Sequence, residues 1–268
     1  MVNKTCSKCR QAKPLDEYNK GKGRFGKIAV CKSCSKERNK ASIDRRRANL
    51  MSLPRYLTEE QEVSIFEHFN NSCALTGLKD KLCLDHFVPL DWGVTPLKYG
   101  LGGTTFPNMI PFHISINSAK NAMNPVMLFE RYGEKYNISA DRWNAALKYL
   151  AEKNGLSVAD YTNRVNACYM EVQSDRWATG INKKVETNGE IVGWEIERAL
   201  RRNLNIQVVI ELFGTSKTKD YFRTTKVSEM IARRKFEMEV RQSKVKRNLV
   251  EITKEVERLL VEYRKRNQ

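Results

Sequence analysis

Three features are missing from this chain of 268 residues. No apolar run approaches the roughly 18 residues that a transmembrane helix requires, which argues against a membrane protein. The first residues lack the apolar segment of a signal peptide, so we expect the protein in a cytoplasm. Neither a low-complexity segment nor an internal repeat is visible. A chain of this length and composition has room for two or three small folded domains.

Basic residues outnumber acidic ones and gather towards the two ends of the chain. The formal net charge is +17, with +11 in residues 1–50, −2 in residues 51–194 and +8 in residues 195–268. Such a distribution suits a polyanionic partner, because each neutralised phosphate releases condensed counterions. Ribosomal and membrane-surface proteins share a basic composition, so charge alone does not identify the partner.

Two Cys-x-x-Cys pairs lie near the start of the sequence. They are Cys6 with Cys9 and Cys31 with Cys34. In a chain without a secretion signal, this spacing predicts one structural zinc site with four thiolates, in preference to disulfides or unligated thiols. The segment is too short to bury a core of its own, so we expect zinc to fold it.

Polar residues of the central region are spaced around one loop. An apolar, β-forming run over residues 82–90 predicts a short strand that carries Asp85 and His86. A glycine-containing loop follows, and residues 108–120 are expected to form a turn entering a helix with Asn117. Strand, loop and helix would bring these three side chains to one crevice.

This set of groups suits phosphodiester hydrolysis. A carboxylate and an amide oxygen are hard ligands that hold Mg²⁺ while leaving positions for water and phosphate oxygens. Such an ion stabilises the charge that grows on the phosphate and on the leaving oxygen. An imidazole beside it can take the proton of the attacking water, since its ordinary pKa of about 6.5 lies near working pH.

The same residues resemble the motif of the HNH, or ββα-metal, endonuclease family. The matching positions within residues 73–124 are Asp85, His86, Pro89, Leu90, Gly102, Gly103, Asn108, Asn117 and Lys120. The resemblance implies that His86 is the general base and that Asp85 and Asn117 hold one Mg²⁺ or Mn²⁺. It further implies that Asn108 braces the loop orienting His86 and that Lys120 contacts a phosphate. The N-terminal cysteine segment is similar to zinc modules that precede HNH domains in phage-type endonucleases.

Departures from the family pattern concern a second zinc site and the loop. The family often carries two cysteine pairs in this module, whereas here Cys73 alone remains and His113 and Ile116 occupy the second pair's places. We therefore expect no zinc in the central module. The loop between His86 and Asn108 is longer than usual. His113 is expected to pack rather than bind metal, and His68 to be structural.

Helical signals surround the central module. Thr58 begins a capping box for a helix through Phe69, with Val63, Phe66 and Phe69 on its buried face. Ser139 is expected to cap a helix running to Lys153. A further helix is expected over residues 157–172.

The C-terminal part is expected to be a basic α/β region. Asn188 and Gly189 are typical of a two-residue hairpin turn, and residues 206–213 of a strand. Lys217 and Lys219 would lie in loops that grip phosphates. From residue 227 the pattern predicts one or two helices. Apolar positions at heptad spacing over residues 245–263 fit either a dimer-forming seam or a helix packed on its own domain.

A basic helix is expected over residues 36–50, with Arg45, Arg46 and Arg47 near its end. Runs like this are often solvated linkers, but beside a zinc knuckle and a nuclease pattern we favour contact with the DNA backbone.

The expected fold is α+β, in three parts. Residues 1–50 form a zinc knuckle or ribbon, residues 51–174 an HNH module with helical support, and residues 175–268 a region for DNA binding or dimerisation. The expected function is one-metal cleavage or nicking of DNA by a phage or mobile-element homing or host-DNA-degrading enzyme, in the bacterial host cytoplasm. The alternative is a non-catalytic zinc protein that binds DNA as a regulator or packaging accessory. A nuclease of the same fold directed at RNA, or acting as a toxin, is a third possibility.

Overall fold

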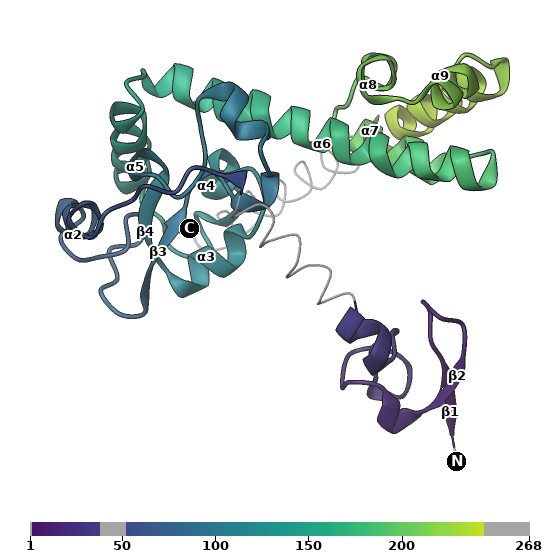
Figure 1. The fold of residues 1–268 in the computed structure, drawn as a ribbon, viewed down its shortest axis with the longest axis horizontal. Helices are drawn as coiled ribbons and strands as arrows, with labels where there is room; N and C mark the ends of the chain where they lie inside the picture. The colour runs from purple at the N-terminus through teal and green to yellow at the C-terminus, as the bar shows by residue number, and fades with distance from the viewer. Residues whose placement is uncertain (1, 38–51, 244–268) are drawn as a thin grey trace, which may run out of the picture. The chain divides into compact units, whose positions relative to one another are not determined.

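The computed structural model describes residues 2–37 and 52–243 (Figure 1). Contacts divide the chain into two compact units, Met1–Tyr169 and Met170–Gln268. Their boundary falls inside helix α6 (Val158–Asn188). Among the described residues no helix combines the length and apolarity needed to cross a membrane.

The N-terminal segment is a small module that buries few apolar side chains. Strands β1 (Asn3–Thr5) and β2 (Ala12–Pro14) pair antiparallel, and 3₁₀ turns follow at Leu15–Glu17 and Arg24–Gly26. Its buried cluster consists of Tyr18 and three of the four cysteines, with Cys9 packed against it. A helix begins at residue 32 and is described to residue 37. Arg45, Arg46 and Arg47 lie outside the described residues.

A two-stranded sheet followed by a helix forms the centre of the first unit. Strand β3 (Leu82–His86) pairs antiparallel with β4 (Met109–His113), and α3 (Ile114–Lys120) packs on both strands. The strand expected to carry Asp85 and His86 is confirmed. The turn expected over residues 109–113 is wrong, because this apolar stretch is the second strand. Pro111 is compatible with it, since a two-stranded sheet has only edge strands.

The long loop between β3 and β4 is built from 3₁₀ turns at Leu90–Trp92, Thr95–Tyr99 and Phe106–Asn108. It is fastened at several points. The indole of Trp92 donates to the carbonyl of Ala122 at 3.0 Å. Gly103 has a φ of +74°, and a Cβ there would lie 2.7 Å from the carbonyl oxygen of Pro54, so only glycine allows this close approach.

Helices cover the sheet and close the core of the first unit. They are α2 (Glu59–His68), α4 (Leu128–Tyr132), α5 (Ala140–Lys153) and the first part of α6. The capping box at Thr58 and the cap at Ser139 are confirmed. The predicted buried face of this segment is confirmed for Phe69 and wrong for Val63, which is exposed, while Ile65 is buried instead.

The second unit is entirely helical in its described part, residues 170–243. After α6 come α7 (Gly193–Arg201), α8 (Ile206–Phe213), α9 (Ser216–Phe222) and a helix over residues 225–243 (Figure 1). The predicted α/β character of this region is therefore wrong. The heptad positions over residues 245–263 lie outside the described residues.

Two sequence patterns in this region fit both the predicted structure and the observed one. Gly189, with a φ of +75°, ends α6 and donates its N–H to Val185, so the expected hairpin turn is a helix C-cap. Both structures need a residue with positive φ. The expected strand is α8, whose buried residues Ile206, Val209 and Ile210 follow helical spacing after the cap at Asn205. A short apolar run does not by itself separate strand from helix.

Candidate active site and cysteine cluster

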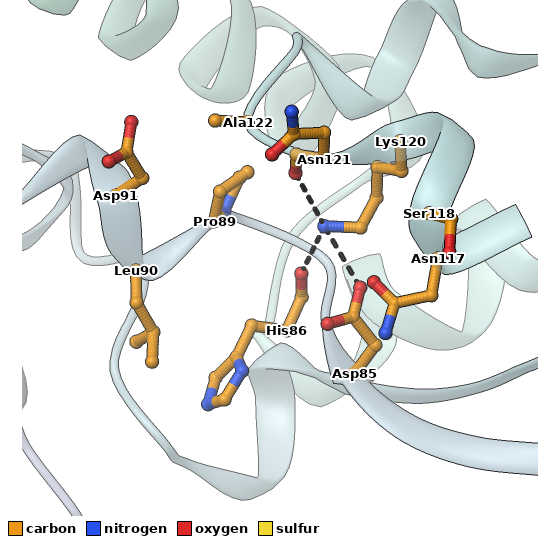
Figure 2. A pocket seen from close by; sticks show the side chains of 10 residues that line it. All are labelled: Asp85, His86, Pro89, Leu90, Asp91, Asn117, Ser118, Lys120, Asn121 and Ala122. Atoms are coloured by element: carbon orange, nitrogen blue, oxygen red, sulfur yellow. Dashed lines mark hydrogen bonds and ion pairs between the residues drawn. The ribbon is translucent and has the colours of Figure 1, made fainter. Parts of the chain in front are cut away.

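Asp85, His86 and Asn117 line one open pocket of about 550 Å³. Asp85 and His86 are the last two residues of β3, opposite Ile110 and Met109 of β4. Asn117 comes from α3, and Figure 2 shows its amide beside the carboxylate of Asp85. The crevice expected from the sequence is thus present, although a second strand, rather than a turn, leads into the helix.

The Asn117 amide faces the Asp85 carboxylate at close range. The amide atom nearest Asp85 lies 3.1 Å from Oδ2 and 3.3 Å from Oδ1. If that atom is nitrogen, it donates to the carboxylate. If it is oxygen, the nitrogen donates to Sγ of Cys83 at 3.4 Å and two acceptors face each other. The second arrangement is favourable only with a cation shared between them, because both oxygens carry negative charge.

Lys120 is held inside the site rather than at its surface. Its side chain is 2% exposed, and Nζ lies 2.9 Å from Oδ2 of Asp85. Nζ also donates to the carbonyl of His86 at 2.8 Å and to that of Asn121 at 3.4 Å (Figure 2). Burial lowers the pKa of Lys120, and the Asp85 charge opposes this shift. The phosphate contact expected of Lys120 does not fit this arrangement, since its ammonium is already paired and covered.

Asn108 fastens the loop behind His86. It is buried, its Oδ1 accepts the N–H of Val88 at 2.9 Å, and its Nδ2 donates to the carbonyls of Val88 and Gly103 at 3.1 and 2.8 Å. The chain returning from β3 is thereby tied to the segment entering β4. This geometry suits the bracing role that the resemblance implied for Asn108.

His86 contacts a residue that the sequence did not point out. Its Nε2 lies 2.9 Å from Oγ1 of Thr104. The Thr104 backbone is itself held, because its N–H donates to Pro54 and its carbonyl accepts from Tyr56 and Leu57. A hydroxyl can donate to a ring nitrogen or accept from it, so this contact orients the imidazole in either tautomer. The only sequence signal was its position directly after Gly102 and Gly103.

The four paired cysteines come together in the N-terminal module. Their ligand atoms all lie within 4.8 Å of one another. Sγ of Cys6 accepts the backbone N–H of Cys31 at 3.3 Å and that of Lys8 at 3.4 Å. Backbone N–H groups, that of Cys31 foremost, lower the pKa of the Cys6 thiol to about 6. Such bonds favour the thiolate, which is the form that binds metal, so the cluster is compatible with a zinc site.

The other predicted site residues within the described part of the chain do not line the pocket. Lys217 and Lys219 belong to helix α9 of the second unit, not to a loop as expected. Nζ of Lys217 donates to the carbonyl of Glu186 at 3.4 Å, and Nζ of Lys219 lies 3.7 Å from Glu211. His68 packs its ring against Tyr149, with 4.5 Å between ring centroids. His113 caps α3 by accepting the N–H of Ser115. Neither histidine lines the pocket.

No family model, curated protein or solved structure matches this chain. The geometry and chemistry of the site itself are therefore what point to a function.

Proposed function

We propose that the chain is a metal-dependent endonuclease of the HNH type that hydrolyses phosphodiester bonds in DNA. One observation carries the proposal: Asp85, His86 and Asn117 converge on a single open pocket, placed there by two antiparallel strands and a helix. The surplus of basic residues supports a nucleic-acid substrate. A phage or mobile element is the proposed source, and a bacterial cytoplasm the proposed setting.

Asp85 and Asn117 would hold the catalytic Mg²⁺ or Mn²⁺. The chemistry of the donor set fits such an ion, because a carboxylate and, in the orientation that turns its oxygen to Asp85, an amide oxygen are the hard ligands that these ions prefer. The bound ion would stabilise negative charge on the phosphate and on the leaving 3′-oxygen.

The protein's own residues would prepare the attacking water and keep the site in place. His86 would accept the proton of the water at a ring nitrogen, in the orientation that Thr104 supports. Asn108 would keep the loop after β3 in register with β4. Lys120 would fix the rotamer of Asp85 instead of touching the substrate. By the family resemblance, the products would carry 5′-phosphate and 3′-hydroxyl ends.

The alternative function is a zinc-containing protein that binds DNA without cutting it. It is favoured by the pairing of Asp85 with Lys120, because an ammonium that neutralises this carboxylate competes with a divalent cation for it. On this alternative, the ion pair is a structural element and His86 has no catalytic task.

Cleavage of supercoiled plasmid separates the two. The full chain would be incubated with plasmid and Mg²⁺ or Mn²⁺, alongside His86→Ala and the control His68→Ala, which removes a histidine outside the pocket. We expect metal-dependent open-circle or linear products from the unchanged chain and from His68→Ala, and at least a hundredfold loss in His86→Ala.

One result would overturn the nuclease proposal, and a second would overturn the role given to His86. If all three proteins leave the plasmid intact but retard it in a gel, the non-catalytic alternative holds. If His86→Ala cuts as fast as the unchanged chain, His86 is not the general base. A parallel incubation with single-stranded RNA tests the substrate class, and preferential cleavage of RNA would contradict the choice of DNA.

A further inference from the structure

A second pocket, separate from the candidate active site, lies within the second unit between α6 and α7. Its volume is about 280 Å³. Arg176 and Lys184 line it from α6, and Arg198 and Arg202 from the end of α7. The two helices are joined beside it, because the indole of Trp177 donates to the backbone carbonyl of Glu195 at 3.1 Å. Both walls of the pocket are therefore fixed by the fold.

Positive charge in this pocket exceeds negative charge. Glu195 is the one carboxylate among its lining residues, and it is already engaged by the ammonium of Lys184 and the backbone N–H of Val192. Within residues 170–243, no ion pair joins Arg198 or Arg202 to a carboxylate. Their neighbours differ, since Arg201 pairs with Glu197 and Arg223 with Glu211. Guanidinium groups without a carboxylate are suited to bind phosphate oxygens.

Two further features keep the pocket open and its cations in position. The ring of Trp194 lies under the Arg198 guanidinium, 4.3 Å from its centroid, and under the Lys184 ammonium at 4.9 Å. Contacts of this kind hold a cation without neutralising it. Gly180 lines the pocket from the middle of α6, and a Cβ there would meet nothing within 4 Å. A glycine inside a helix is less favourable than an alanine, and here it leaves room in the pocket.

We propose that this pocket binds backbone phosphates of DNA and anchors the substrate at a site apart from the candidate active site. The choice of DNA rests on the proposed function, whereas the anion-binding character rests on the pocket's own charges. Arg198 and Arg202 are the contacting residues. Arg201 provides a matched control, because it sits beside Arg202 near the end of α7 but pairs with Glu197 and does not line the pocket.

The test measures binding of the full chain to a fluorescently labelled duplex by anisotropy, at several salt concentrations. All proteins carry His86→Ala and no divalent metal is added, so cleavage does not interfere. We expect Arg198→Ala and Arg202→Ala each to weaken binding about five- to tenfold at 0.1 M salt and to reduce the salt slope by about one. Arg201→Ala should change affinity less than twofold.

A second variant works without removing an arginine. Gly180→Glu adds a carboxylate beside the pocket and replaces glycine by a better helix former. We expect it to weaken binding at least fivefold while the melting temperature stays equal or rises, so a loss of binding cannot be ascribed to unfolding.

Unchanged affinity and salt slope in Arg198→Ala, Arg202→Ala and Gly180→Glu would overturn the proposal. An equal loss in Arg201→Ala would also overturn it, since the effect would then follow net charge rather than the pocket. The outcome is distinct from that of the plasmid assay. A chain that cuts DNA with unaltered binding in these variants refutes only the anchor, and a chain that binds through the pocket without cutting refutes only the nuclease.

Discussion

The cysteine cluster and the pocket at the end of β3 are two ways of arranging groups that can bind metal. The cluster brings four soft ligands of one kind within 4.8 Å of one another, and three of the four cysteines are buried. The pocket offers one carboxylate and one amide beside an imidazole, and it is open to solvent. A closed site of four thiolates has no position left for a substrate, whereas an open site with few oxygen ligands keeps positions for water and phosphate. Under the proposed function, the first site contributes stability and the second carries out the chemistry.

Loss of a cysteine ligand should have the largest effect on folding. Cys31→Ser removes one of the sulfurs that, with Tyr18, make up the buried cluster of the N-terminal module. Structural zinc contributes on the order of 10 kcal/mol to such modules. We expect residues 2–37 to lose their dispersed NMR signals. We also expect the chain to lose its zinc, which elemental analysis measures. Cys168→Ala, outside the cluster, should keep the zinc. Full zinc content in Cys31→Ser would show that the cluster is not the site.

Removing the buried ammonium should have the next largest effect. Lys120→Met leaves the Asp85 carboxylate, which is 15% exposed, without its partner and should lower the free energy of unfolding by about 3 kcal/mol. Denaturant titration measures this loss. Lys148→Met breaks the exposed contact with Glu152 at 3.8 Å and should cost less than about 0.5 kcal/mol.

The same variant also tests whether a divalent cation binds at Asp85. With Lys120 replaced, a divalent cation is the remaining way to neutralise Asp85, so Mn²⁺ should stabilise Lys120→Met more than the unchanged chain. Equal stabilisation of both proteins by Mn²⁺ would contradict binding at Asp85.

Asn108→Ala should destabilise the first unit by about 2 kcal/mol. It removes three hydrogen bonds from a buried position and leaves the N–H of Val88 and the carbonyl of Gly103 without this partner. Asn163→Ala, on the exposed face of α6, is the control and should leave the unfolding free energy within about 0.5 kcal/mol. Similar unfolding curves for both variants would refute the bracing role.

Thr104→Val should have the smallest effect on stability and a visible effect on rate. It keeps the shape of the side chain but removes the hydroxyl 2.9 Å from Nε2 of His86. We expect kcat for DNA cleavage to fall about tenfold, because the imidazole of His86 loses the hydroxyl that orients it. Thr104→Ser retains the hydroxyl and should recover most of the rate. A serine variant as slow as the valine variant would assign Thr104 a packing role only.

The predictions from sequence succeeded where short-range chemistry decides the structure. Cysteine spacing gave the four-sulfur cluster, and capping residues gave the starts of α2 and α5, because these signals involve residues close in the chain. The sequence also predicted that Asp85, His86 and Asn117 share one crevice, because the order of strand, loop and helix brings the end of the strand next to the helix.

Other parts depend on contacts that no local pattern contains. Strand β4 was missed because its apolar residues also fit a turn before a helix. Its pairing with β3, which no local pattern shows, makes it a strand. The burial of Lys120 follows from packing of α3 against Asp85, so its sequence position alone suggested a surface charge. Gly189 and the run at residues 206–213 satisfy both helical and strand patterns, and helix packing in the second unit selected the helices.

Selective broadening of histidine NMR signals by Mn²⁺ would show directly whether a divalent cation binds at the end of β3. The chain contains only three histidines, so their signals can be told apart. His86 adjoins the Asp85 and Asn117 pair, whereas His113 lies at the opposite end of the strand ladder, across from Leu82. With histidine-labelled protein, substoichiometric Mn²⁺ should broaden His86 most strongly and His68 and His113 less, and should lose its effect in Asp85→Asn. Equal broadening of all three histidines, or selective broadening that persists in Asp85→Asn, would contradict a divalent-cation site at the end of β3.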